Sequence, residues 1–101
     1  MTGIRHWRTL GLLSDEEYRK SQIALTKRPE VGAIIEGSGG LRKVRWALPG
    51  RGKSGGVRVI YYWAVRQERL LMLLIYAKSE MDDLTPRQLA ILRRIVEEEY
   101  P

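Results

Sequence analysis

The spacing of apolar residues changes twice along this chain, from helical spacing to every second position and back, and this pattern limits the folds that the chain can adopt. Within Leu41 to Leu48 and Val57 to Val65, apolar side chains recur at every second position, as in strands with one buried face. Leu70 to Ala77 is apolar throughout, which is typical of a central strand buried on both faces. Because the link Arg66 to Arg69 is short, we predict an antiparallel hairpin between the last two strands.

Signals for helix starts flank these strands. Ser14 and Glu17 have the spacing of a capping box, which predicts a helix that runs to about Lys27. Thr85 and Gln88 have the same spacing, and the helix that they open is expected to end around Glu98.

Two further segments carry weaker signals. Pro29 to Ile35 is predicted to form a second short helix or a turn, with Val31, Ile34 and Ile35 packing inward. Ile4 to Leu10 is predicted to form an additional edge strand.

These elements predict an α+β fold, in which a small twisted antiparallel sheet packs against N-terminal helices and a C-terminal helix. The chain has 101 residues and no linker that would divide it, so we expect residues 1–101 to form one domain. The longest apolar run has eight residues, far fewer than the roughly 20 of a membrane-spanning helix. We therefore expect a cytoplasmic protein that has no contact with a membrane.

Positive charge is concentrated in the middle third of the chain. Between Gly37 and Gln67 there are seven basic residues and no acidic one, while the formal net charge of the whole chain is +6. A patch of one sign is the usual footprint of a polyanionic partner, most often a nucleic acid. Residues of this stretch that we predict to bind RNA, without a direct part in chemistry, are Arg42, Arg51, Lys53 and Tyr62.

The composition excludes several kinds of site. There is no cysteine and a single histidine, His6, which removes disulfides, thiolate nucleophiles and catalytic triads. Asp82 and Asp83, beside Glu80, are interpreted as a solvated turn or a helix-entry signal, so we predict no metal site and no cofactor.

Metal-free cleavage of RNA remains open to such a chain, because the substrate's own 2′-OH can attack the adjacent phosphate. The protein must then supply cations for the phosphate and groups that move protons. The residues that we predict to be catalytic are Lys43, Arg45, Arg58, Tyr76, Lys78 and Glu80. Lys43 and Arg45 share one face of a strand, whereas the face of Arg58 depends on hairpin register, which sequence does not determine.

Three segments of the chain resemble the RelE/ParE superfamily of bacterial toxins, and its HigB-like branch in particular. They are the run from Gly39 to Trp46, the run from Arg51 to Tyr62, and the run from Leu74 to Glu80. The resemblance implies a RelE-like fold and a toxin of a type II toxin–antitoxin module. It also implies a ribosome-dependent endoribonuclease that cleaves translated mRNA, and it assigns the basic site positions to Lys43, Arg45, Arg58 and Lys78.

The expected partners follow from the same resemblance: the ribosome, mRNA and a HigA-like helix-turn-helix antitoxin. The chain departs from the best-known RelE-type toxins at Ser79, where they carry an arginine, so the residues that act as base and acid stay open. Two alternative functions also remain: a ParE-type inhibitor of DNA gyrase, and a nucleic-acid-binding module without catalytic activity.

Overall fold

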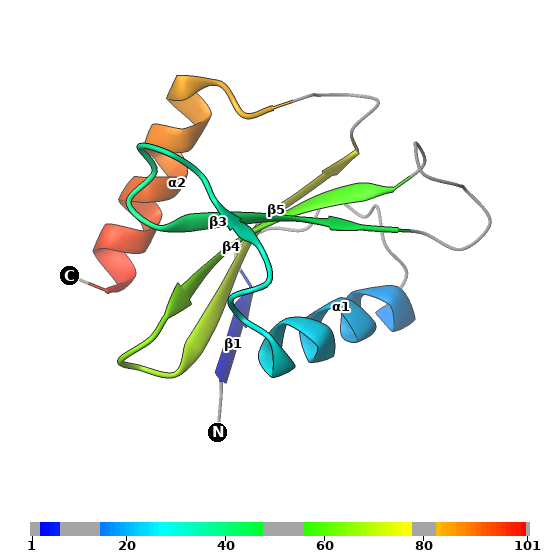
Figure 1. Cartoon of the computed structure of the whole chain (residues 1–101). Coiled ribbons are helices and arrows are strands. Elements are labelled where there is room, and N and C mark those ends of the chain that lie inside the picture. The colour runs from blue at the N-terminus through cyan, green and yellow to red at the C-terminus, as the bar shows by residue number, and fades with distance from the viewer. Residues whose placement is uncertain (1–2, 7–14, 48–55, 78–82, 101) are drawn as a thin grey trace.

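A five-stranded sheet forms the centre of the protein in this computed structural model, which describes residues 3–6, 15–47, 56–77 and 83–100 (Figure 1). The strands, in chain order, are β1 (Gly3–His6), β2 (Ala33–Ile34), β3 (Leu41–Trp46), β4 (Val57–Ala64) and β5 (Arg69–Ala77). Their order across the sheet is β1-β5-β4-β3-β2. The hairpin of β4 and β5 is therefore confirmed, and β5 lies inside the sheet between β4 and β1, as its uninterrupted apolar run predicts.

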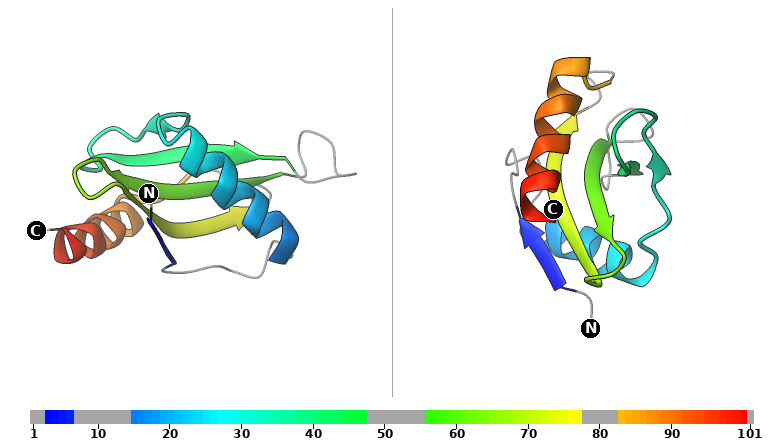
Figure 2. Two further views of the ribbon diagram at one scale, coloured as in Figure 1. Left: turned by 90° about the horizontal axis from the view of Figure 1, so that it is seen from below. Right: turned by 90° about the vertical axis from the view of Figure 1, so that its left-hand side faces the viewer.

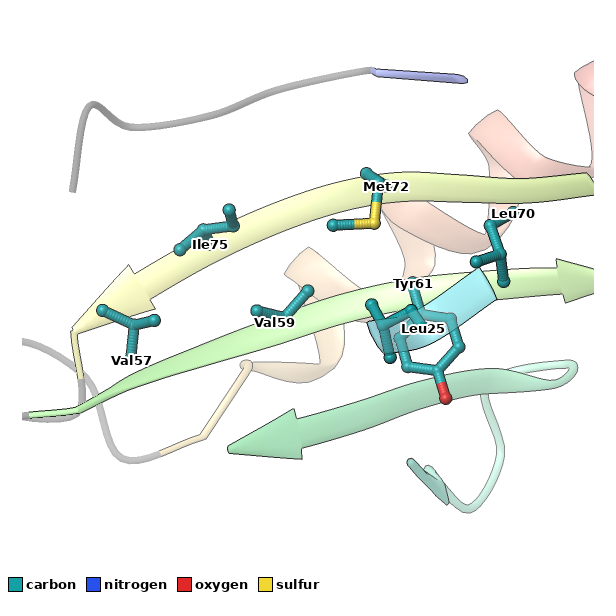
Figure 3. Packing of buried hydrophobic residues seen from close by; sticks show 7 residues of the cluster. All are labelled: Leu25, Val57, Val59, Tyr61, Leu70, Met72 and Ile75. Carbon is teal, nitrogen blue, oxygen red and sulfur yellow. The ribbon is translucent and has the colours of Figure 1, made fainter. Parts of the chain in front are cut away.

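Two helices, α1 (Asp15–Lys27) and α2 (Pro86–Glu99), cover opposite faces of the sheet (Figure 2). Leu25 of α1 packs with Val59 and Tyr61 of β4, as Figure 3 shows for the buried side chains on this face. On the other face, Leu92 and Val96 of α2 pack against side chains of β3, β4 and β5. Because side chains alternate along each strand, they contribute to two separate hydrophobic clusters, one beneath each helix.

The start of α2 confirms the predicted capping box. The Thr85 hydroxyl accepts a hydrogen bond from the Gln88 backbone N–H, and the Gln88 side chain accepts one from the Thr85 backbone N–H. These contacts satisfy two donors that a helix N-terminus otherwise leaves without partners. The end of α1 at Lys27 agrees with the prediction, whereas Ser14, which was expected to open this helix, lies outside the described residues.

Two predictions about the periphery of the sheet were incomplete or wrong. The edge strand predicted over Ile4 to Leu10 is present as β1 over Gly3–His6, and residues 7–10 lie outside the described residues. This strand runs parallel to β5, so the sheet is mixed and not wholly antiparallel. In the segment from Pro29 to Ile35, the turn is present at Pro29 and Glu30, whereas Ala33 and Ile34 form the short edge strand β2, which was not predicted. Within the described residues no strand lies beyond β2, so Val31 and Ile34 are exposed, whereas Ile35 packs against the cluster beneath α2.

The pairing of β4 with β5 contains one irregularity. Ile60 lies opposite Leu74, and Tyr61 lies opposite Met72, which leaves Leu73 without a partner. This β-bulge places both Leu73 and Leu74 on the face covered by α2. As a result Tyr76 faces the α2 side of the sheet, together with Leu71.

Neither α1 nor α2 is both long enough and apolar enough to cross a lipid bilayer.

Candidate functional site

Three of the predicted catalytic side chains lie in one row across the sheet. Arg45 of β3 is directly opposite Arg58 of β4, which is directly opposite Tyr76 of β5. Residues paired in this way have Cβ atoms about 5 Å apart on the same face. The register thus places Arg58 on the face of Lys43 and Arg45, which sequence alone left open.

The row brings two positive charges together at a cost to the fold. Like charges directly opposite each other on neighbouring strands are destabilising, and within the described part of the chain no carboxylate forms an ion pair with Arg45 or Arg58. Such a pair is well suited to hold an anion between the two guanidinium groups, because each can donate several hydrogen bonds in a fixed geometry.

Lys43 extends this face towards α2 and contacts a residue that the sequence analysis did not place in the site. Its Nζ atom lies 2.7 Å from Oδ1 of Asp83, in the connection just before the cap of α2. The hydrogen bond from Lys43 lowers the pKa of the exposed Asp83 carboxyl below its usual value, and the positive charges of Lys43 and Arg58 add to this effect. Asp83 is therefore an anion at neutral pH, and a phosphate that approaches Lys43 competes with it.

Tyr76 is buried, with 2% of its surface exposed. Its hydroxyl has no hydrogen-bond partner among the described residues. Burial raises the pKa of this hydroxyl; Lys43 opposes the increase, Asp83 adds to it, and Arg58 opposes it. The hydroxyl is therefore protonated at neutral pH and is able to donate a hydrogen bond.

A pocket of about 300 Å³ adjoins these groups. Its polar lining includes Lys43, Tyr76 and Asp83. Its apolar lining consists of Ile35, from the segment after β2, together with Leu84 and Leu89, from the start of α2. The site thus combines two adjacent cations on the sheet, Arg45 and Arg58, with a neighbouring pocket that has both polar and apolar lining. We call this pair of arginines the cation row.

The structure does not bring Arg42 to this face. Its guanidinium donates to the carbonyl oxygens of Glu30, at 3.1 Å, and of Gly32, at 2.8 Å, and lies 5.8 Å from the centre of the Trp63 ring. These contacts fasten the segment before β2 to the sheet, on the side of the sheet opposite to Lys43. The alternation of side chains along β3 accounts for this position.

Tyr62 lies on the same face as Arg58, four residues further along β4, which is about 13 Å. Its ring packs near the Tyr100 ring, with 6.0 Å between the ring centres, at the C-terminal end of α2. The structure thus separates Tyr62 from the cation row.

The other predicted site residues, Arg51, Lys53, Lys78 and Glu80, lie outside the described residues. Within the residues that the structure describes, no group of three or more His, Cys, Asp or Glu side chains is placed to hold a metal ion.

Comparisons with known proteins agree with this architecture. Residues 14–99 match the model of the RelE family, described as the RelE toxin of the RelE/RelB toxin–antitoxin system. The structure is also similar to that of E. coli toxin RelE in the free state, solved as a double arginine-to-alanine mutant, with a TM-score of 0.55 and 13% sequence identity. The similarity covers 79% of this chain and 86% of the E. coli chain, and at this identity it concerns the fold. Since the family model spans most of the chain, the protein belongs to the RelE family of toxins from toxin–antitoxin systems.

Proposed function

We propose that the protein is an endoribonuclease that cleaves mRNA on the translating ribosome. The observation that carries the proposal is the pairing of Arg45 with Arg58, with Lys43 on the same face of the sheet. The two guanidinium groups lie side by side on this face, where they can donate hydrogen bonds to the oxygens of a phosphodiester. Membership in the RelE toxin family supports the same conclusion.

In the proposed reaction the substrate's 2′-oxygen attacks the adjacent phosphorus atom. The bond from phosphorus to the 5′-oxygen breaks, and the products are a 2′,3′-cyclic phosphate and a 5′-hydroxyl. The proton that leaves the 2′-OH is replaced by one delivered to the 5′-oxygen. The nucleophile belongs to the RNA, so the protein's part is to position the phosphate and to stabilise its additional negative charge.

The roles of the individual side chains follow from their chemistry. Arg45 and Arg58 remain protonated, so they bind the phosphate oxygens and stabilise charge without exchanging protons. Lys43 adds a third cation once the RNA phosphate displaces Asp83 from it. Lys78 directly follows β5 in the chain, and together with Glu80 it is proposed to complete this group. The proposal places the RNA across β3, β4 and β5 on the face that carries α2.

The partner in the cell is proposed to be a HigA-like helix-turn-helix antitoxin, and the toxin itself, over residues 1–101, a single domain of the HigB-like branch. This part rests on the resemblance of the segments from Arg51 to Tyr62 and from Leu74 to Glu80. It is tested by co-expression with the product of the neighbouring reading frame. The partner is expected to co-purify with the toxin and to restore growth; a neighbour that does neither contradicts it.

The nuclease is tested by inducing the protein in bacteria and mapping 5′ ends on translated mRNA. New 5′ ends are expected within coding regions, and blocking translation is expected to abolish them. Arg58→Ala is expected to reduce cleavage by roughly 10²–10³-fold, the usual effect of removing one group that stabilises a transition state. Growth arrest with intact mRNA would refute the proposal, and a DNA-damage response with cleaved chromosomes would indicate gyrase as the target instead.

A matched control separates the loss of site chemistry from the loss of positive charge. Arg94→Ala removes the same charge from the exposed surface of α2, where Arg94 pairs with Glu98 at 3.7 Å. This variant is expected to retain wild-type cleavage and toxicity. Wild-type toxicity in an Arg45→Ala/Arg58→Ala double variant that folds normally would show that the row is not the active site.

A further inference from the structure

The pocket beside the cation row has the composition of a small-molecule site. Its volume of about 300 Å³ lies at the lower end of the range of about 300–1,000 Å³ that is usual for such sites. Apolar side chains line it from three places: Ile35 just after β2, Leu84 just before the cap of α2, and Leu89 within α2. Sites for flat heteroaromatic ligands need apolar contacts for the ring faces and a few polar groups for the ring edge, and this pocket provides both.

The Tyr76 hydroxyl is the feature of this pocket that points to a ligand. It is buried, it lacks a hydrogen-bond partner among the described residues, and its residue lines the pocket. An unpartnered buried polar group lowers the stability of a fold, so native structures contain few of them. Phenylalanine would fill the same space without this penalty. A ligand that supplies a hydrogen-bond partner would remove this penalty.

The charges around the hydroxyl restrict what that ligand is. Lys43 donates hydrogen bonds, whereas the carboxylates of Asp83 and Glu36 accept them, and all three residues line the pocket. The two carboxylates disfavour an anion inside the pocket, and the ammonium group disfavours a cation. A neutral group whose edge carries both donors and acceptors suits this surface, and the edge of a nucleobase has that pattern.

We propose that this pocket binds one nucleobase of the RNA and that the Tyr76 hydroxyl forms a hydrogen bond with its edge. The inference rests on the proposed nuclease function, because the cation row would hold the phosphate attached to the same nucleotide. The pocket would then select the base beside the scissile phosphate, while the row performs the chemistry. Asp83 contributes to both, because it lines the pocket and its carboxylate neutralises Lys43 until RNA binds.

Binding is tested without the ribosome, by NMR titration of the free protein with each of the four nucleoside 3′-monophosphates. Ribose 5-phosphate serves as a probe that has a phosphate but no base. At least one nucleotide is expected to produce saturable shifts at the amides of Ile35, Leu84 and Leu89, and ribose 5-phosphate is expected to produce none there. Shifts of equal size with ribose 5-phosphate, or none with any nucleotide, would overturn the inference.

The role of the hydroxyl is tested with Tyr76→Phe, which keeps the ring and removes only the oxygen. The dissociation constant of the preferred nucleotide is expected to rise roughly five- to tenfold, the value of about one neutral hydrogen bond. Tyr18→Phe is the matched control, because Tyr18 belongs to α1 and packs against the cluster on the opposite face of the sheet. Unchanged binding by Tyr76→Phe refutes the assigned contact.

Mapping of mRNA ends distinguishes failure of the pocket from failure of the nuclease. Wild-type cleavage is expected to favour one base beside the cut, and Tyr76→Phe is expected to weaken that preference. Cleavage without a base preference, unchanged in Tyr76→Phe, overturns the pocket and leaves the nuclease standing. Intact mRNA with wild-type protein overturns the nuclease, whereas saturable nucleotide shifts at the pocket would still support a base-binding site.

Discussion

Tyr61 and Tyr76 are two buried tyrosines whose hydroxyl groups differ in a way that predicts opposite effects of the same mutation. Tyr61 has no exposed surface, and its hydroxyl donates to the Pro29 carbonyl oxygen at 2.6 Å and accepts from the Gly32 N–H at 2.9 Å. The Tyr76 hydroxyl has no such partner among the described residues. Replacing each with phenylalanine therefore removes two hydrogen bonds in one case and an unsatisfied group in the other.

The magnitudes follow from these contacts. Tyr61→Phe loses two bonds worth about 1 kcal/mol each and leaves the buried Gly32 N–H without its partner, so we expect a loss of about 2–4 kcal/mol. Tyr76→Phe removes the desolvation penalty of one hydroxyl, so we expect a gain of about 1 kcal/mol. A change of 1 kcal/mol shifts the melting temperature of a domain of this size by roughly 4–8 °C.

Urea unfolding followed by circular dichroism measures both variants against the wild type, and thermal melts give an independent value. Tyr61→Phe is expected to melt at least about 8 °C below the wild type and Tyr76→Phe a few degrees above it. Equal losses in both variants would refute the reasoning, because they would show that the Tyr76 hydroxyl is satisfied in the free protein. A more stable Tyr76→Phe protein that also binds nucleotide less well would connect this measurement with the proposed base pocket.

Three further outcomes are expected. Asp83→Asn removes the carboxylate that competes for Lys43, so RNA should bind the free protein more tightly in filter-binding assays at low salt; weaker binding would show that Asp83 helps to hold the RNA. Thr85→Ala removes the cap of α2 and should lower the free energy of unfolding by about 1 kcal/mol, whereas an unchanged urea midpoint would show that the cap contributes nothing. Burial raises the pKa of Tyr61 and of Tyr76, so the folded state keeps protons that unfolded tyrosines lose above a pH of about 10. The free energy of unfolding is then highest below that pH and falls as the pH rises through the folded-state pKa values; stability that stays constant to pH 12 would contradict these shifts.

The faces of individual strands could be predicted from the sequence, but their mutual register could not. Alternation along β3 is sufficient to place Lys43 and Arg45 together, and the capping box at Thr85 defines the start of α2. Arg58 alternates with apolar neighbours on β4, so its face relative to β3 depends on which residues pair, and tertiary packing decides that. The pairing of Arg58 with Arg45 is therefore known only from the structure of the sheet.

Contacts between segments far apart in the chain also could not be predicted from the sequence. Asp83 was interpreted as part of a solvated turn or a helix-entry signal, and neither interpretation includes its 2.7 Å contact with Lys43, 40 positions away. No local sequence pattern around an acidic residue that precedes a helix cap predicts which distant residue it contacts. Arg42 lies next to Lys43 in the chain, yet its side chain lies on the other face and donates to backbone carbonyl oxygens there. The number of basic residues in a strand therefore does not predict how many of them can contact a ligand.

The unpaired residue Leu73 affects how β5 should be aligned with the same strand in distant relatives. Leu71 and Tyr76 are an odd number of positions apart, and a regular ladder would turn one of them away from the other. They share a side here because the strand absorbs one additional residue between them. A relative whose strand is one residue shorter at this point would present the same tyrosine with no irregularity at all. A single-residue gap in such an alignment therefore marks a bulge that was gained or lost. The residues before and after the gap can still have the same chemical roles in both proteins.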